Sequence, residues 1–174
     1  MKMKTEFLLN REVDLVLAAL TPVNRLIMRV ALHTGLRIGD ILLLHPWQLK
    51  SQFWITEQKT GKRRRVGLPA QLLNDLRENS GKYWVFEGAH DIKKHRTRQS
   101  VWKDVKRACK AFRLPQNGSP HSFRKVFAVD LLKKYGDIER VRRALNHSSI
   151  SVTLIYAMAD LTLQQKYKKL RNEK

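Results

Sequence analysis

Apolar residues recur at helical spacing along most of this chain, and local start and stop signals divide them into short segments. The first such segment runs from Glu12 to Leu20. Thr21 and Pro22 then supply an N-cap and a first-turn proline for a second helix, and Gly35 supplies its C-terminal stop. This pattern predicts a mainly helical protein.

The rest of the chain follows the same pattern, with one change of period. Further helices are predicted at residues 37–44, 69–78, 100–112, 121–135, 138–145, 151–158 and 161–170. Three short strands are predicted at 47–49, 53–57 and 64–68, and a strand or extended segment at 83–86. Residues 59–62 include Gly61 and are predicted to form the tip of a hairpin between the last two strands.

These elements predict a mainly α protein with a small antiparallel β-sheet (α+β). The length of 174 residues suits one domain, and 43% hydrophobic residues are enough to form a core. Neither an internal repeat nor a Pro/Gly-rich linker marks a boundary. We therefore expect a single domain over residues 1–174.

The charge of the chain indicates a polyanionic partner. Its 35 Lys and Arg against 15 Asp and Glu give a formal net charge of +20. Such an excess favours nucleic acid through long-range attraction and release of counterions. Ribosomal proteins, histone-like proteins, membrane-surface binders and nucleic-acid enzymes share this property, so charge indicates the partner and not the activity.

The single cysteine and the lack of long apolar runs indicate a cytoplasmic protein. Cys109 cannot form an internal disulfide and has no neighbours at metal-ligand spacing. No stretch approaches the roughly 20 apolar residues of a membrane span, and the N-terminus lacks the features of a signal peptide. We expect no membrane contact.

One short motif carries residues suited to phosphate chemistry. Metal-free cleavage of a phosphodiester needs a nucleophile, cationic donors for the phosphate oxygens and an acid for the leaving oxygen. His121 and Arg124 lie one turn apart at the start of a predicted helix, where anions are favoured. Such a pair is usually an ordinary surface pair, so it gains meaning only from other motifs.

Other motifs are present, and together they resemble those of the tyrosine recombinase (phage integrase) family, catalytic domain. Residues 34–40 read TGLRIGD, residues 120–124 read PHSFR, residues 145–156 read LNHSSISVTLIY, and the hairpin at 57–62 reads EQKTGK. The motifs have the family's order, and the resemblance covers roughly residues 12–170. It implies the integrase-type fold of DNA breaking and rejoining enzymes.

The resemblance implies that two arginines hold the phosphate. Arg37 and Arg124 would clamp it, and His121 would donate a hydrogen bond and shuttle a proton. The alternative, non-catalytic interpretation of Arg37 is a surface arginine at a helix junction. Asp40 would support the site by orienting Arg37 or His121, although an ordinary ion pair one turn away is nearly as good an interpretation.

The resemblance also implies a leaving-group acid in the hairpin. Lys59 lies at the family's lysine position and would protonate the 5′ oxygen, with Lys62 as the alternative. Lys62, Arg63, Arg64 and Arg65 form a basic run that we expect to grip the DNA backbone. Lys59 could also belong to that run.

The last motif implies a second histidine and the nucleophile. His147 would donate a further hydrogen bond to the phosphate, the alternative being a helix-capping histidine. Tyr156, nine residues later, would attack phosphorus and leave a 3′-phosphotyrosyl DNA. The other tyrosines, Tyr83, Tyr135 and Tyr167, lack this spacing from the histidine.

The chain departs from the family pattern at two points. Asn146 stands where glycine is common, and asparagine tolerates the left-handed backbone conformation that such a turn needs. Only about ten residues precede the first predicted helix, so we expect no N-terminal core-binding domain. An accessory DNA-binding protein is therefore a candidate partner.

The resemblance implies a site-specific recombinase that acts on double-stranded DNA as a tetramer and needs no cofactor, metal or ATP. One alternative is a type IB topoisomerase-like nicking and resealing enzyme. The other is a catalytically silent DNA-binding or architectural relative, which would show a broken set of catalytic residues. The residues of this set are all present in the sequence.

Overall fold

The computed structural model describes residues 8–114 and 118–146 of the chain. Its elements are α1 (Asn10–Ala19), α2 (Pro22–Thr34), α3 (Ile38–Leu42), the 3-10 helix η1 (Pro46–Gln48), β1 (Gln52–Thr56), β2 (Arg63–Gly67), α4 (Ala70–Glu78), α5 (Arg98–Ala111), α6 (Pro120–Tyr135) and α7 (Ile138–Leu145). The expected fold class, mainly helical with one small antiparallel sheet, is confirmed.

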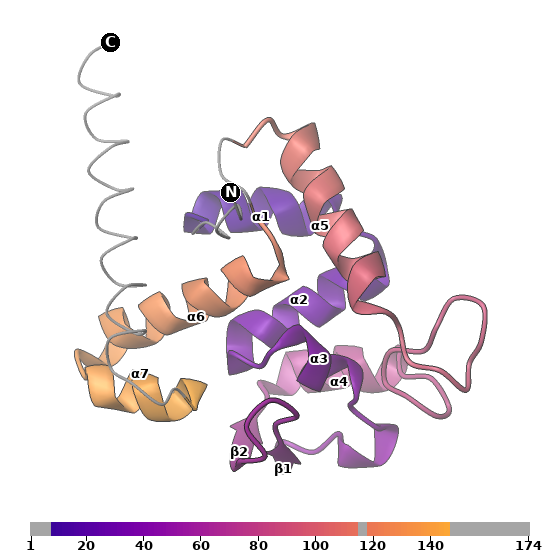
Figure 1. The fold of residues 1–174 in the computed structure, drawn as a ribbon, viewed down its shortest axis with the longest axis horizontal. Coiled ribbons are helices and arrows are strands. Elements are labelled where there is room, and N and C mark those ends of the chain that lie inside the picture. The colour runs from indigo at the N-terminus through magenta and orange to yellow at the C-terminus, as the bar shows by residue number, and fades with distance from the viewer. Residues whose placement is uncertain (1–7, 115–117, 147–174) are drawn as a thin grey trace.

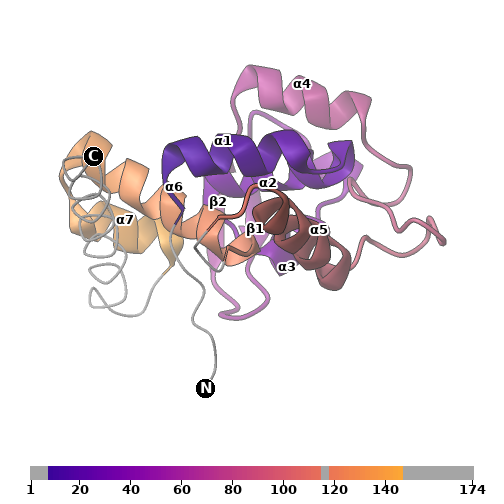
Figure 2. The same cartoon turned by 90° about the horizontal axis from the view of Figure 1, so that it is seen from above.

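Helix α2 lies in the middle of the fold, as Figures 1 and 2 show. It packs against α1, α3, α4 and α6, and α7 packs against α6. Its residues Ile27, Met28 and Val30 are fully buried. An amphipathic helix that meets neighbours on several sides organises the core through this apolar surface.

The sharp turn after α2 depends on glycine. Gly35 has φ 62° in the left-handed region, and its N–H donates to the Ala31 carbonyl at 2.9 Å. A Cβ at this position would lie 2.3 Å from Cδ1 of Phe127 in α6. The predicted end of this helix is confirmed, and both the backbone conformation and the packing explain why a glycine occupies it.

The strands β1 and β2 form an antiparallel hairpin in which Thr56 pairs with Arg63. Phe53, Ile55 and Val66 are buried, whereas Trp54 is exposed on the opposite face. This alternation follows from the two-residue period of a strand. The hairpin therefore presents one apolar face to the core and one face to solvent.

Two expected strands are absent from the described part of the chain, the second of which, at 83–86, was expected as a strand or an extended segment. Residues 47–49 were predicted as a strand, but Pro46–Gln48 forms a 3-10 helix in which Gln48 N–H donates to the His45 carbonyl at 3.0 Å. Proline fixes φ and lacks a ladder donor, which favours this turn. Residues 83–86 form no strand. The Val85 N–H instead donates to the Leu44 carbonyl at 2.9 Å.

The remaining described helices agree with the predictions to within a few residues. Helix α7 has the predicted bounds, and Asn146 ends it with φ 56° in the left-handed region. Asparagine thus adopts the conformation expected of it. The helices predicted at 151–158 and 161–170 lie outside the described residues.

Candidate active site

Arg37 is positioned by the turn that follows Gly35. It is the N-cap residue of α3, with an extended backbone at φ −70° and ψ 146°. Its side chain is 24% exposed, and Nη1 donates to Oε2 of Glu57 at 2.5 Å. The guanidinium is therefore fixed in direction and still accessible.

Glu57 is a member of the site that the sequence did not identify. Its side chain has no solvent exposure, and it accepts hydrogen bonds from Arg37 and from Oγ1 of Thr60 at 3.2 Å. It thereby joins α3 to the hairpin loop. A signal was present in the sequence, because Glu57 is the single acidic residue between Phe53 and Leu68.

Arg64 does not have the place that we expected for a DNA contact. Its side chain is 11% exposed, and its guanidinium donates to the carbonyls of Thr34 and Ala144. Burial lowers the pKa of Arg64 from its ordinary value, and the carboxylate of Glu57 opposes this effect. We correct its role to that of an internal residue that ties the hairpin to the ends of α2 and α7.

The neighbours of Arg64 in the basic run face solvent. Lys62, Arg63 and Arg65 are exposed, and the Arg63 guanidinium lies 5.4 Å from the ring centre of Trp54. Alternation along β2 explains why one of three consecutive arginines points inward.

Helix α6 supplies His121 and Arg124 from its first turns. Arg124 is 2% exposed; Nη1 donates to the Gly35 carbonyl, and Nη2 donates to the Leu145 carbonyl at 2.6 Å. These carbonyls lie at the C-terminal ends of α2 and α7, where a cation is favoured. His121 is exposed at the start of the same helix.

Asp40 supports the site in a way that differs from the prediction. We expected it to orient Arg37 or His121, but its Oδ1 accepts the backbone N–H of Gln58 at 2.9 Å. The side chain is buried, and in the part of the chain that the structure describes its Oδ2 has no hydrogen-bond partner. Asp40 thus holds the hairpin loop immediately before Lys59.

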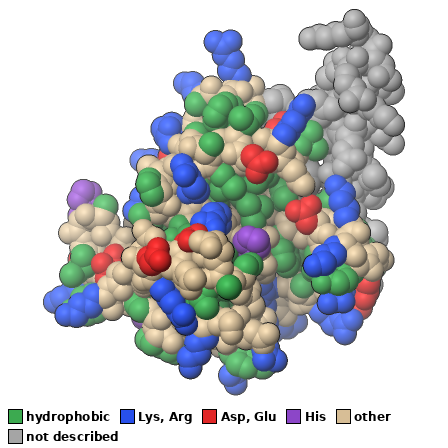
Figure 3. All heavy atoms as spheres, turned by 180° about the vertical axis from the view of Figure 1, so that it is seen from behind, with side chains coloured by type: hydrophobic (Ala, Val, Ile, Leu, Met, Phe, Trp, Pro, Cys, Tyr) green, Lys and Arg blue, Asp and Glu red, His purple; other side chains and the backbone are tan. Residues whose placement is uncertain are grey.

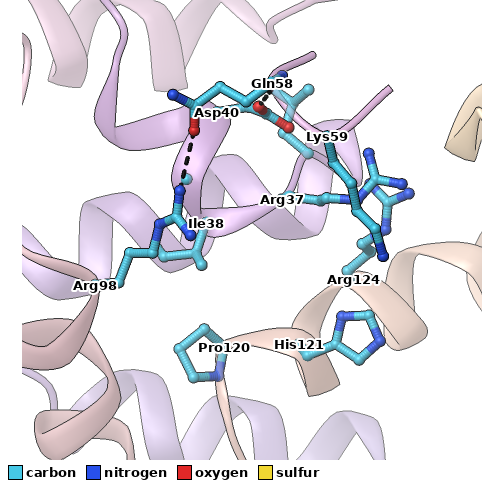
Figure 4. Close-up of a pocket in the computed structure, with 11 residues that line it drawn as sticks. Arg37, Ile38, Asp40, Gln58, Lys59, Arg98, Pro120, His121 and Arg124 are labelled. Atoms are coloured by element: carbon cyan, nitrogen blue, oxygen red, sulfur yellow. Dashed lines mark hydrogen bonds between the residues drawn. The ribbon is translucent and has the colours of Figure 1, made fainter. Parts of the chain in front are cut away.

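One cavity of about 400 Å³ brings these groups together. It is lined by Leu36, Arg37, Ile38, Gly39, Asp40, Gln58, Lys59, Arg98, Pro120, His121 and Arg124. Figure 4 shows the side chains of Lys59, Arg124 and His121 around the same space. Because the lining has four Lys or Arg side chains and one carboxylate, the cavity suits an anion.

Arg98 and Gln58 are further lining residues that the sequence did not identify. Arg98 belongs to α5 and donates from Nη2 to Oε1 of Gln58 at 3.0 Å. The two residues are 40 positions apart; Gln58 belongs to the hairpin motif at 57–62 but was given no role there, and Arg98 belongs to no motif. Only the fold brings them together.

His147 and Tyr156 lie outside the described residues. The carbonyl of Leu145, two positions before His147 in the sequence, accepts a hydrogen bond from Arg124 in the site. Across residues 8–114 and 118–146, no group of three or more His, Cys, Asp or Glu side chains could hold a metal ion. None of the helices in these two ranges is long and apolar enough to cross a membrane.

Comparisons with known proteins agree with this architecture. The model of the phage integrase family matches residues 6–162. The probable integrase/recombinase YoeC of Bacillus subtilis (strain 168) is 32% identical over 136 residues, which are 74% of either chain. The catalytic domain of bacteriophage HP1 integrase has a similar structure, with a TM-score of 0.68, 27% identity and coverage of 90% of this chain and 89% of that one.

A lambda integrase tetramer bound to a Holliday junction has a similar fold, with a TM-score of 0.74 at 19% identity. The match covers 90% of this chain and 49% of that one. The chain also spans only 42%, 56% and 44% of three further relatives, a putative integrase/recombinase, a tyrosine recombinase and an integrase.

The fold and the basic cavity define a catalytic domain of the integrase type. The chain belongs to the phage integrase family, a family of DNA breaking and rejoining enzymes.

Proposed function

We propose that this chain is a site-specific recombinase that cuts and rejoins duplex DNA through a 3′-phosphotyrosyl intermediate on Tyr156. Family membership supports the reaction type. The single observation that carries the proposal is the shared cavity of Arg37, Lys59, His121 and Arg124, which come from three separate segments of the chain. The cavity thus combines two candidate phosphate clamps with a candidate acid for the leaving oxygen.

The geometry suits a phosphate held before the reaction begins. The guanidinium of Arg37 donates a hydrogen bond to the buried carboxylate of Glu57, and that of Arg124 donates hydrogen bonds to two backbone carbonyls. Neither guanidinium therefore needs to reorganise when charge develops on the phosphate oxygens. His121, and His147 by family resemblance, would add hydrogen bonds to the same oxygens.

The proposed step exchanges one bond for another. The phenol oxygen of Tyr156 bonds to phosphorus, and the bond from phosphorus to the 5′ oxygen breaks. His121 takes the phenol proton, and Lys59 gives a proton to the 5′ oxygen. Attack of a 5′ hydroxyl on the phosphotyrosine reverses the step and rejoins DNA without ATP.

We further propose that the partner is double-stranded DNA and that four chains assemble on two DNA sites. The net charge of +20 supports the first part. The similar fold of lambda integrase, whose structure is a tetramer on a Holliday junction, supports the second. A topoisomerase-like enzyme that acts alone is not favoured, because the named relatives are integrases and recombinases.

A trapping experiment tests the reaction. The full chain is incubated with nicked duplexes of randomised sequence, on which cleavage releases a short fragment that diffuses away. Protein-DNA adducts that survive denaturation are captured and sequenced, and the attached residue is mapped by mass spectrometry. We expect attachment at Tyr156.

Tyr156→Phe is the matched control, because it removes one oxygen and no cation. We expect the adduct to disappear while affinity for the selected duplex stays unchanged. Arg37→Ala should still form the adduct, but on the order of 10²–10³-fold more slowly. Absence of any adduct from the unchanged chain, or attachment at Tyr135 or Tyr167, would contradict the proposal.

A further inference from the structure

Arg98 lies closer to the backbone of α3 than an ordinary surface arginine would. A Cβ built on Gly39 would be 2.6 Å from Nη2 and 2.9 Å from Cζ of Arg98. Any side chain at position 39 would have to displace the guanidinium. Glycine at position 39 thus leaves room for the guanidinium in this place, whereas the turn at Gly35 requires glycine for its backbone conformation as well.

The guanidinium of Arg98 holds one end of Gln58, and α3 holds the other. Arg98 Nη2 donates to Oε1 of Gln58 at 3.0 Å, and the backbone N–H of Gln58 donates to Oδ1 of Asp40 at 2.9 Å. Figure 4 shows Arg98 reaching Gln58 from α5, on the other side of the cavity from Lys59. Two elements distant in sequence therefore fix the residue that precedes Lys59.

The loop closes on itself through the Gly61 N–H, which donates to the Glu57 carbonyl at 2.8 Å, and the Glu57 N–H, which donates to the Lys62 carbonyl at 3.0 Å, so these bonds hold its ends rather than Lys59. Residues 58–62 are all exposed. Gly61 has φ 64°, and a Cβ built on it would have no other atom within 4 Å. A general acid must come within roughly 2.6–3.2 Å of the oxygen that it protonates. A lysine on a loosely held loop would meet this requirement only part of the time.

We propose that Arg98 is a positioning residue for Lys59, acting through Gln58 and accommodated by Gly39. The inference rests on the proposed function, in which Lys59 protonates the 5′ leaving oxygen. Arg98 raises the rate of cleavage by keeping the Lys59 ammonium within reach of that oxygen. It does so without itself binding the scissile phosphate.

The test compares two versions of one selected nicked duplex. In the first, the leaving atom is the normal 5′ oxygen, and in the second it is sulfur, which departs without a proton. A residue that acts through the acid matters for oxygen and not for sulfur. A phosphate contact or a general structural role slows both substrates alike.

The variants are Arg98→Ala, Gln58→Ala and Gly39→Ala, each of which breaks the same chain of contacts at a different point. We expect single-turnover cleavage of the oxygen substrate to slow by about tenfold or more in each, within the range of an acid's contribution. Cleavage of the sulfur substrate should stay at the rate of the unchanged chain. Lys103→Ala, which removes an exposed cation from the same helix outside the cavity, should alter neither rate.

The double variant Arg98→Ala/Lys59→Ala gives a second, independent reading. Once Lys59 is absent, Arg98 has nothing to position, so the double variant should be no slower than Lys59→Ala alone. Melting temperatures of all variants identify any that are misfolded. Cleavage of the sulfur substrate shows whether the catalytic groups other than the acid still work.

Three results would overturn the inference. Equal slowing of both substrates by Arg98→Ala would make it a phosphate contact or a structural residue. Additive losses of cleavage rate in the double variant would show that Arg98 acts independently of Lys59. Failure of sulfur to rescue Lys59→Ala would remove the acid role on which the inference depends, whereas the proposed recombinase reaction would still stand if the unchanged chain forms the Tyr156 adduct.

Discussion

Asp104 shows how a single buried carboxylate fixes two helices far from the active site. It lies in α5 and accepts hydrogen bonds from the Thr21 backbone N–H at 3.0 Å and from Nδ2 of Asn24 at 2.7 Å. Arg107 also donates to it at 2.6 Å. The start of α2 is therefore tied to α5 through one charged side chain, which serves as an N-terminal cap supplied from another helix.

The pKa of Asp104 makes this contact sensitive to acid. Burial acts to raise the pKa, but the hydrogen bonds from Asn24, Thr21 and Arg107 outweigh it and hold the pKa below the ordinary value of 3.8. A carboxyl whose pKa is lower in the folded state stabilises fully above its unfolded pKa. That contribution is lost as pH falls through the folded value.

We predict that Asp104→Asn lowers the free energy of unfolding by about 2–3 kcal/mol at neutral pH, because it removes a charged acceptor from several donors. The difference between the two proteins should shrink as the pH falls below the ordinary carboxyl pKa. Urea unfolding at a series of pH values measures it. A difference that stays constant down to strongly acidic pH would contradict the assignment.

At the residue scale, the sequence predicted the groups with local motifs and missed those defined by tertiary contact. Arg37, His121 and Arg124 were found because each belongs to a short pattern. Arg98 was not, since a helix-starting arginine has many possible partners, and Glu57, although part of the hairpin motif, was given no role because its contacts with Arg37 and Thr60 follow from the fold. Their roles follow from where α3, α5 and the hairpin meet.

At the scale of the elements, local signals decided which predictions succeeded. The start of α2 at Pro22 and its end at Gly35 depend on backbone preferences that act within a few residues. The prediction for 47–49 failed because apolar residues in a short run fit a strand or a turn equally well. Pro46 and the contact of Gln48 with the His45 N–H decided in favour of the turn.

The hairpin offers a test in which three neighbouring arginines have different roles. Arg63 and Arg65 are exposed, whereas Arg64 binds internal carbonyls. We predict that Arg63→Ala and Arg65→Ala each weaken duplex binding and reduce its salt dependence by about one unit of slope, with little effect on folding.

Arg64→Ala should do the reverse, because it leaves the carbonyls of Thr34 and Ala144 without this donor and removes a cation from beside Glu57. We expect the free energy of unfolding to fall by roughly 2–4 kcal/mol. Parallel measurements of duplex affinity and of chemical unfolding on the three variants separate the roles. If all three variants reduced affinity equally and none reduced stability, all three arginines would contact the DNA backbone, as the sequence predicted.

At the scale of the whole molecule, burial makes the surface more basic than the composition alone suggests. Glu12, Asp40, Glu57 and Asp104 are buried, and within the two described ranges Arg124 is the single buried cation. Acidic side chains thus hold much of the interior, and apart from Arg124 and the largely buried Arg64 most cations of the described residues lie nearer the surface. Figure 3 shows Lys and Arg side chains at many places on one face, with acidic side chains at fewer.

This distribution predicts duplex binding that is strong at low salt and weakens steeply as salt rises. A protein that neutralises six to ten phosphates loses roughly 10³–10⁵ in affinity between about 50 and 200 mM salt, because the gain from counterion release disappears. With a net charge of +20, we expect this chain to fall in that range on duplexes of unrelated sequence. Fluorescence anisotropy over a salt series measures the slope. Melting temperatures over the same series control for loss of folding, and an affinity that is independent of salt would show that the surface cations do not contact the phosphates.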